Sequence, residues 1–279
     1  MLLPYMAGFL GNYLEKYIHL GVAVSMFTAF SFAYTNNIPD YIYVVWTGLA
    51  AIWLYNNHDI LSKPINQWHR LARGYSNAAF LLLIIPGGIR MIIGTPGVLL
   101  SFLVAAGLTM SYYSGLASSG TPLKSHFVLK HLVIGLVYGI IGVVVPAQLS
   151  GYSITEATYL SAGRIAFVAV LAILFDIGEA GEEGSIVGRG LLPSRAGVEK
   201  TRVACLGLLI FACLTDWLAG SSISVSGDAQ ISLGLTYILA GLLVYISDPR
   251  FSRNYYLLVV DGLLAVPWLL MVLLRLMAN

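Results

Sequence analysis

Long apolar runs recur along this chain, and they constrain its fold more than any other feature. A membrane-crossing helix needs about 20 mostly apolar residues, and nine such runs follow one another between short polar links. The runs are too long and continuous for membrane-barrel strands, which alternate. Backbone groups in lipid must pair within the segment, so we expect helices. The predicted spans cover residues 17–35, 41–57, 77–94, 97–114, 127–147, 159–177, 201–220, 230–247 and 255–276.

The charge content agrees with a lipid environment. Only 10% of the residues are charged and 58% are hydrophobic, whereas a soluble domain carries about 25% charged residues. We predict an all-α, polytopic membrane protein that forms a single domain over residues 1–279. The sequence contains no block of charge of the kind that would indicate nucleic-acid binding. No removable signal peptide is expected at the start. Cys205 and Cys213 lie in one apolar run without disulfide or metal spacing.

The basic residues predict an orientation. Lys and Arg concentrate in the loops after the second, fourth, sixth and eighth predicted spans. The positive-inside rule places such loops in the cytoplasm. With nine spans, we expect a cytoplasmic N-terminus and a C-terminus on the other side.

The stretch from Phe175 to Gly197 holds four acids in eight residues. Asp176, Glu179 and Glu183 are three and four residues apart, so they share one face if the helix continues. Carboxylates at the end of a membrane helix are costly unless a cation meets them. Mg²⁺ suits this place, because it takes one or two protein carboxylates together with water and phosphate oxygens. The alternative is a solvated acidic loop.

Two other polar segments are predicted on the same membrane side. Asn56 and Asp59 follow the second span and are three residues apart, as expected for one helical face; the alternative is a capped helix end. Lys124 and Lys130 follow the fourth span. Cations there would stabilise the charge that develops on a departing diphosphate. The alternative is that both lysines only set the topology.

These three segments resemble motifs of the UbiA superfamily of intramembrane prenyltransferases. The second family motif, D-x-x-D-x-x-x-D and the residues after it, is similar to Asp176, Glu179, Glu183, Gly188, Arg189, Leu191-Leu192-Pro193 and Gly197. A further family pattern, Y-S-x-P-P-x-R-L-K and L-K-N, is similar to Tyr113-Ser114, Pro122-Leu123-Lys124 and Leu129-Lys130-His131.

The first family motif, N-D-x-x-D-x-x-x-D-x-x-N-x-P-x-R, is matched less well. When Asn66 and Arg70 are aligned with it, Asn56 takes the place of the first Asp and Asp59 that of the second. Lys63 replaces the third acid. Lys63 would contact phosphate in place of a metal, or it would mark lost activity.

The resemblance implies nine transmembrane helices around a central cavity that opens to the bilayer. It implies Mg²⁺-dependent ionisation of a prenyl diphosphate and transfer of the prenyl group to a lipophilic acceptor. The same ionisation would serve a terpene cyclase, which needs no acceptor; a non-catalytic isoprenoid-binding descendant is the other alternative. The implied metal ligands are Asn56, Asp59, Asp176, Glu179 and Glu183; the implied diphosphate-binding residues are Asn56, Lys63, Arg70, Lys124, Lys130 and Arg189.

Aromatic and ionisable residues inside the spans also require an interpretation. An aromatic cavity wall would shield an allylic cation by cation–π contact; the candidates are Trp46, Trp53, Tyr112, Tyr113 and Tyr138. Asp261 is an acid within a membrane helix and is therefore a functional candidate; the alternative, which we favour, is a pair with Arg250 or Arg253. Arg164 is expected to snorkel near the outer end of its span. Asp216 and His131 are expected at the membrane interface.

Overall fold

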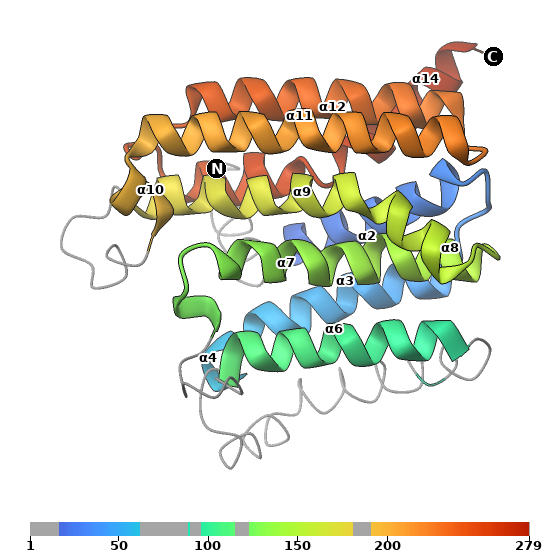
Figure 1. Cartoon of the computed structure of the whole chain (residues 1–279), viewed down its shortest axis with the longest axis horizontal. Helices are drawn as coiled ribbons and strands as arrows, with labels where there is room; N and C mark the ends of the chain where they lie inside the picture. Colours follow the sequence, from blue (N-terminus) through green and yellow to red (C-terminus); the bar gives the residue numbers. More distant parts are fainter. Residues whose placement is uncertain (1–16, 62–88, 90–95, 115–122, 181–190, 279) are drawn as a thin grey trace, which may run out of the picture.

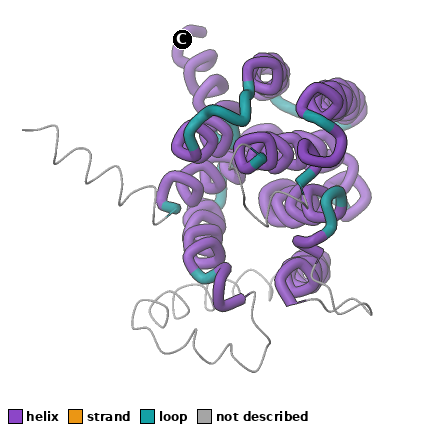
Figure 2. The backbone as a smooth tube through the Cα atoms, turned by 90° about the vertical axis from the view of Figure 1, so that its left-hand side faces the viewer, coloured by secondary structure: helices purple, strands orange, loops and turns teal. Residues whose placement is uncertain are grey.

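A computed structural model describes residues 17–61, 89, 96–114, 123–180 and 191–278. Within these ranges the chain is helical and contains no strand (Figures 1 and 2). The α-helices are α2 (Ile18–Tyr34), α3 (Tyr41–Asn56), α4 (His58–Leu61), α6 (Pro96–Ser114), α7 (Leu129–Gly139), α8 (Val145–Leu149), α9 (Ile154–Glu179), α10 (Leu192–Ala196), α11 (Val198–Ser222), α12 (Gly227–Ile246), α13 (Arg253–Tyr255) and α14 (Val266–Ala278). Leu123–Ser125 is a 3₁₀-helix, η2, and Ile140–Val144 and Tyr256–Val260 are π-helices, η3 and η5.

The all-helical prediction is confirmed for the described residues. Four helices there are long and apolar enough to cross a membrane: the continuous series Leu129–Leu149, and α9, α11 and α12. This agrees with an integral membrane protein. The predicted spans 17–35, 41–57, 97–114 and 255–276 fall on helices that are shorter or interrupted. The predicted span 77–94 lies almost wholly outside the described residues.

Helix α9 occupies the middle of the bundle. It packs against α11 on one side and α7 on the other, and α3 and α6 lie beyond α7 (Figure 1). Most of its apolar stretch is buried, whereas α11 and α12 leave most of theirs exposed. Their exposed side chains include Phe211, Trp217 and Ile238. So large an apolar surface suits contact with lipid better than contact with water.

Local sequence signals account for several helix ends and contacts. Asp40 accepts hydrogen bonds from the backbone N–H groups of Ile42 and Tyr43 and so caps α3. Ser153 and Glu156 form a capping box at the start of α9. Where α2 crosses α3, a Cβ atom on Gly48 would lie 2.6 Å from the carbonyl oxygen of Gly21. Glycine is required for this close approach of two backbones.

The alternating direction of the helices brings several chain segments to one end of the bundle. This end holds α4, the start of α7, the end of α9 and α10, at the left of Figure 1, and Figure 2 looks onto it. We call it the α10 end. It carries the described parts of all three motifs discussed above.

Candidate functional site

Asp176 is the centre of the candidate site. It lies near the last turn of α9 and is only 4% exposed. Lys130 Nζ donates to its Oδ1 atom at 2.6 Å, and His131 Nε2 lies 3.0 Å from Oδ2. The backbone N–H of Leu192 donates to Oδ2 at 3.3 Å. The structure therefore joins one acid of the second motif to the basic pair of the third.

The backbone explains why these groups converge. Lys130 and His131 are neighbours in the first turn of α7, which packs along α9. After α9, the chain returns through an extended Leu191 and starts α10 at Leu192 and Pro193. An N–H group in a first helical turn has no acceptor within its own helix, so that of Leu192 is available to Asp176. His131 is buried, and its position at the membrane interface stays a prediction.

The carboxylates are of a kind that suits Mg²⁺. Oδ1 of Asp176 accepts one hydrogen bond and Oδ2 accepts two, of about four that a carboxylate can accept. Glu179 is exposed one turn further along α9. Mg²⁺ needs only one or two protein carboxylates, so Asp176 and Glu179 can serve. Glu183 and Arg189 lie outside the described residues. Among those described, no three His, Cys, Asp or Glu side chains gather as a metal site.

The first motif lies at the same end of the bundle. Helix α3 ends at Asn56, and α4, which contains Asp59, contacts α3 and α6. The exposed amide of Asn56 donates to the carbonyl oxygen of Ile52 at 2.8 Å. Lys63 and Arg70 are outside the described residues. The metal and phosphate roles of this motif remain predictions.

Further cations lie at the α10 end. Lys124 is half-buried in η2, which contacts both α6 and α7. The guanidinium of Arg195, in α10, lies 4.6 Å from the centre of the Phe127 ring. Arg195 was not predicted as a site residue, although it lies two residues after the Leu-Leu-Pro segment of the second motif.

Tyrosines extend from the Asp176 region toward the middle of the bundle. Tyr112 lies close enough to Asp176 and Glu179 to interact with their charges. The rings of Tyr112 and Tyr113 are nearly perpendicular, with centres 5.0 Å apart. Further in, Tyr138 donates its hydroxyl to that of Tyr55 at 3.3 Å. Three predicted aromatic residues, Tyr112, Tyr113 and Tyr138, therefore belong to one series.

The two tryptophans proposed for the same wall lie differently. Trp53 is half-buried on α3. Trp46 stacks on Tyr43, with ring centres 5.7 Å apart, and meets Phe102 edge-on. These residues belong to a second, smaller apolar core. Trp46 therefore serves packing between α3 and α6.

Asp261 has a different partner from the one predicted. Its Oδ2 atom lies 3.2 Å from His19 Nε2, and both side chains are buried. Arg250 instead pairs with Asp248 in the loop after α12, at 2.9 Å. The prediction of an Arg250 or Arg253 partner was wrong because α2, far away in the sequence, packs against the last helical segment.

Arg164 and Asp216 are also buried, contrary to expectation. They are 1% and 3% exposed, and Arg164 Nη1 lies 4.0 Å from Asp216 Oδ1. The Arg164 guanidinium stacks 3.9 Å from the Tyr34 ring centre, and Tyr237 donates its hydroxyl to Asp216. A Cβ atom on Gly163 would lie 2.5 Å from Asp216 Oδ2, so glycine lets α11 approach α9 here. These four side chains, Arg164, Asp216, Tyr34 and Tyr237, form what we call the Arg164 cluster.

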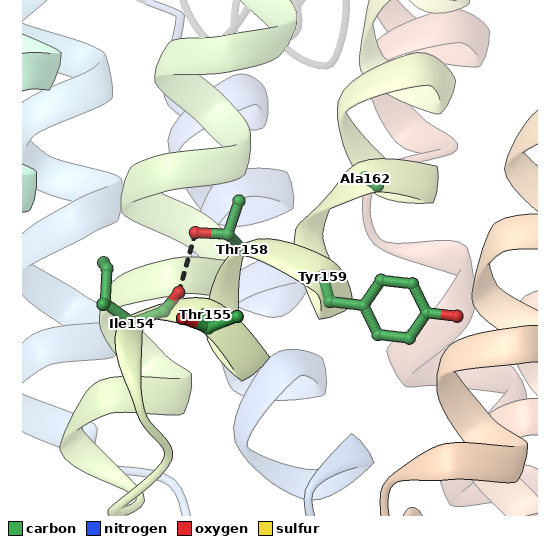
Figure 3. Close-up of a pocket in the computed structure, with 5 residues that line it drawn as sticks. All are labelled: Ile154, Thr155, Thr158, Tyr159 and Ala162. Atoms are coloured by element: carbon green, nitrogen blue, oxygen red, sulfur yellow. Dashed lines mark hydrogen bonds between the residues drawn. The ribbon is translucent and has the colours of Figure 1, made fainter.

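A shallow surface pocket lies at the start of α9. Ile154, Thr155, Thr158, Tyr159 and Ala162 line it (Figure 3). Thr158 donates its hydroxyl to the Ile154 carbonyl oxygen at 2.7 Å. Thr158 and Asp176 are 18 residues apart in α9, which is about 27 Å along a helix. The pocket is therefore separate from the candidate site.

Comparisons with family models, with curated proteins and with solved structures found no match to this chain.

Proposed function

We propose that this chain is a membrane-embedded prenyltransferase that ionises a prenyl diphosphate at the α10 end of the bundle. The observation that carries the proposal is the convergence of Lys130 and His131 on Asp176. Two segments that resemble UbiA-superfamily motifs, 46 residues apart at Lys130 and Asp176, come together in one buried site. The substrate would be a lipid-soluble prenyl diphosphate, which reaches the site from the bilayer.

Each group has a role in this proposal. Lys130 and Lys124 would contact the non-bridging oxygens of the diphosphate and stabilise the negative charge that grows as the C–O bond breaks. Tyr112 and Tyr113 would face the allylic cation that remains. The apolar surroundings would exclude water, which would otherwise capture that cation. A lipophilic acceptor would then form the new bond and lose a proton.

Mg²⁺ fits the carboxylates of the proposed site. Asp176 and Glu179 would hold it on one side, with Glu183; Asn56 and Asp59 would hold it on the other. When bound, it would neutralise charge on the diphosphate and so assist its departure. Lys63, Arg70 and Arg189 are proposed to contact the diphosphate.

A non-catalytic isoprenoid-binding protein is the second candidate. Asn56 and Lys63 replace acids of the family motif, and most acceptor positions of Asp176 already receive hydrogen bonds from the protein. Such a protein would bind a prenyl diphosphate without cleaving it.

Release of diphosphate from purified protein in nanodiscs tests the proposal. Geranyl, farnesyl and geranylgeranyl diphosphate would be offered with and without Mg²⁺ and with and without a lipophilic acceptor such as a quinone precursor, and the organic phase would be analysed by mass spectrometry. Release only when the acceptor is added would indicate a transferase. We expect Mg²⁺-dependent release that Asp59→Ala and Glu183→Ala abolish. Release with a cyclic hydrocarbon product and no acceptor would indicate a cyclase instead. Binding of these substrates without any release would favour the non-catalytic protein.

A further inference from the structure

The His19–Asp261 pair is a buried acid–base pair that the proposed ionisation does not use. His19 lies in the first turn of α2 and Asp261 directly after η5, 242 residues away in the sequence. The two side chains are 7% and 8% exposed. Ionisable groups inside a membrane protein are costly, so their presence there indicates function more often than structure.

The backbone around Asp261 is irregular. The π-helix η5 ends at Val260, and the N–H groups of Leu263, Leu264 and Ala265 then bond to carbonyls three residues back. The regular helix resumes only at Val266. Single π-helical turns such as η5 recur at functional sites. Broken membrane helices are tolerated where protein or a cavity surrounds them. Asp261 therefore lies at the one break in this helical segment, 253–278, as the structure describes it.

The series of tyrosines ends at this pair. Asp261 lies close enough to Tyr55 and Tyr138 for its charge to act on their hydroxyl groups. The Tyr17 ring lies 5.4 Å from the Tyr55 ring and 6.3 Å from the His19 ring, centre to centre. Tyr138 precedes the other π-helix, η3, by two residues. Polar groups thus continue from Asp176, past the tyrosines, to His19.

The geometry points to the His19–Asp261 pair as the proton acceptor that completes the reaction. This inference rests on the proposed function. Ionisation breaks the C–O bond, and its electron pair leaves with the diphosphate. A double bond of the acceptor or of the substrate supplies the pair for the new bond. A C–H or O–H bond then gives up its electrons to restore a neutral product, and its proton passes to His19.

The chemistry of the pair suits this role. Imidazole accepts a proton near neutral pH, and an adjacent carboxylate orients the ring and stabilises the imidazolium. Asp261 is a charged group that contacts His19. The neighbouring phenols are Tyr17 at the start of α2, Tyr55 of α3 and Tyr138 of α7. Lys130 and His131 belong to the proposed site of ionisation, where they are bonded to Asp176. The pair is needed whether the enzyme is a transferase or a cyclase, since both reactions end in loss of a proton.

The test measures how the cation is divided between hydrocarbon and alcohol products. Farnesyl diphosphate and Mg²⁺ are given to the purified parent, His19→Gln and Asp261→Asn in nanodiscs, and released diphosphate, hydrocarbon and alcohol are measured. A cation that loses a proton to the protein gives a hydrocarbon, whereas water capture gives the alcohol. A general base contributes roughly 100-fold or more, so we expect the hydrocarbon-to-alcohol ratio to fall by about that factor while diphosphate release continues.

Thr28→Val is the matched control. It removes a buried hydroxyl that donates to the Val24 carbonyl oxygen on the same helix and accepts from Thr47 of α3, and it should leave the ratio unchanged. An unchanged ratio in His19→Gln, or an equal fall in diphosphate release and hydrocarbon, overturns the inference and leaves the proposed function standing. Absence of release by the parent from every prenyl diphosphate tried, with and without an added lipophilic acceptor, overturns the proposed function and this inference together.

A second readout does not depend on turnover. Histidine-specific ¹⁵N NMR gives signals from five histidines, and His19→Gln identifies that of His19. N,N-dimethylfarnesylamine, protonated at neutral pH, with inorganic diphosphate imitates the separated ions. We expect the His19 signal to move when this mixture binds to the parent. Binding that leaves the signal in place would show that the pair lies away from the cation and would overturn the inference.

Discussion

Asp176 and Arg164 both lie on α9, but their clusters provide hydrogen-bond partners for the buried charges in different ways. We call Asp176 with Lys130, His131 and the Leu192 N–H group the Asp176 cluster. Asp176 receives donors on both oxygens, from Lys130, His131 and the Leu192 N–H group. In the Arg164 cluster the closest approach of the two charged groups is 4.0 Å, and Arg164 Nη1 bonds to its own helix at the Leu160 carbonyl. Arg164 Nε, Arg164 Nη2 and Asp216 Oδ1 have no hydrogen-bond partner among the described residues.

This difference indicates whether each cluster contributes mainly to stability or to activity. Arg164 lies 12 residues before Asp176, or about 18 Å deeper in the bundle. Its cluster joins α2, α9, α11 and α12, and its hydrogen bonds and ring contacts include none of the described motif residues. We therefore expect changes in the Arg164 cluster to reduce stability, and changes in the Asp176 cluster to reduce activity.

Breaking the Arg164–Asp216 pair should have the largest effect. Arg164→Met leaves the Asp216 carboxylate buried without its cation, which costs about 3–5 kcal/mol in comparable pairs. We expect a marked fall in the midpoint of thermal unfolding in detergent. The double variant Arg164→Met/Asp216→Leu should recover much of the loss, because both charges are removed. A double variant as unstable as the single one would show that packing, rather than charge, is decisive.

Lys130→Met tests the other side of the comparison. Removing one group that stabilises developing negative charge lowers turnover by roughly 10²–10³-fold. We expect that loss in diphosphate release, with a smaller fall in unfolding temperature than for Arg164→Met, because Asp176 keeps His131 and the Leu192 N–H group. Lys130→Arg, which preserves the charge, is the control and should retain more activity. Full activity in Lys130→Met would remove Lys130 from the site.

Tyr237→Phe should produce an intermediate effect on stability. It removes a buried hydrogen bond to the Asp216 carboxylate, and hydrogen bonds to charged groups contribute about 1.5–3 kcal/mol. Tyr34→Phe is the matched comparison, because the Tyr34 hydroxyl donates only to the Asp216 backbone carbonyl, at 3.3 Å. Chemical denaturation should rank Tyr237→Phe as the less stable of the two. The reverse order would show that Tyr34 carries more of the cluster.

The exposed Asp248–Arg250 pair should have the smallest effect. Hydrogen bonds from the Arg250 side chain and backbone lower the pKa of Asp248 to about 2. The folded pKa is therefore below the unfolded value of about 3.9, so any contribution is present above pH 4 and lost as the pH falls toward 2. Asp248→Asn should leave the unfolding temperature between pH 6 and 8 unchanged. A clear loss in that range would contradict the view that exposed pairs contribute little.

Hydropathy alone predicted helices and located their approximate bounds, because lipid forces every backbone group to pair within its own segment. The predicted spans 159–177 and 201–220 lie within α9 and α11, and the predicted span 230–247 ends one residue beyond α12. Motif spacing also selected Asp176 and Lys130, which the fold does bring together. Helical periodicity and loop position carry such information along the chain.

Pairing across the bundle was decided only by the tertiary structure. His19 carries no distinguishing local pattern, the motif that contains His131 did not predict its contact with Asp176, and Asp261, Arg164 and Asp216 were assigned to the wrong environments. Each of these five residues takes its environment from a helical segment that is distant in sequence, and sequence periodicity does not specify which helices become neighbours. The apolar runs therefore determined that this protein consists of helices, and the packing of α2, α7, α9 and α11 decided which buried charges meet.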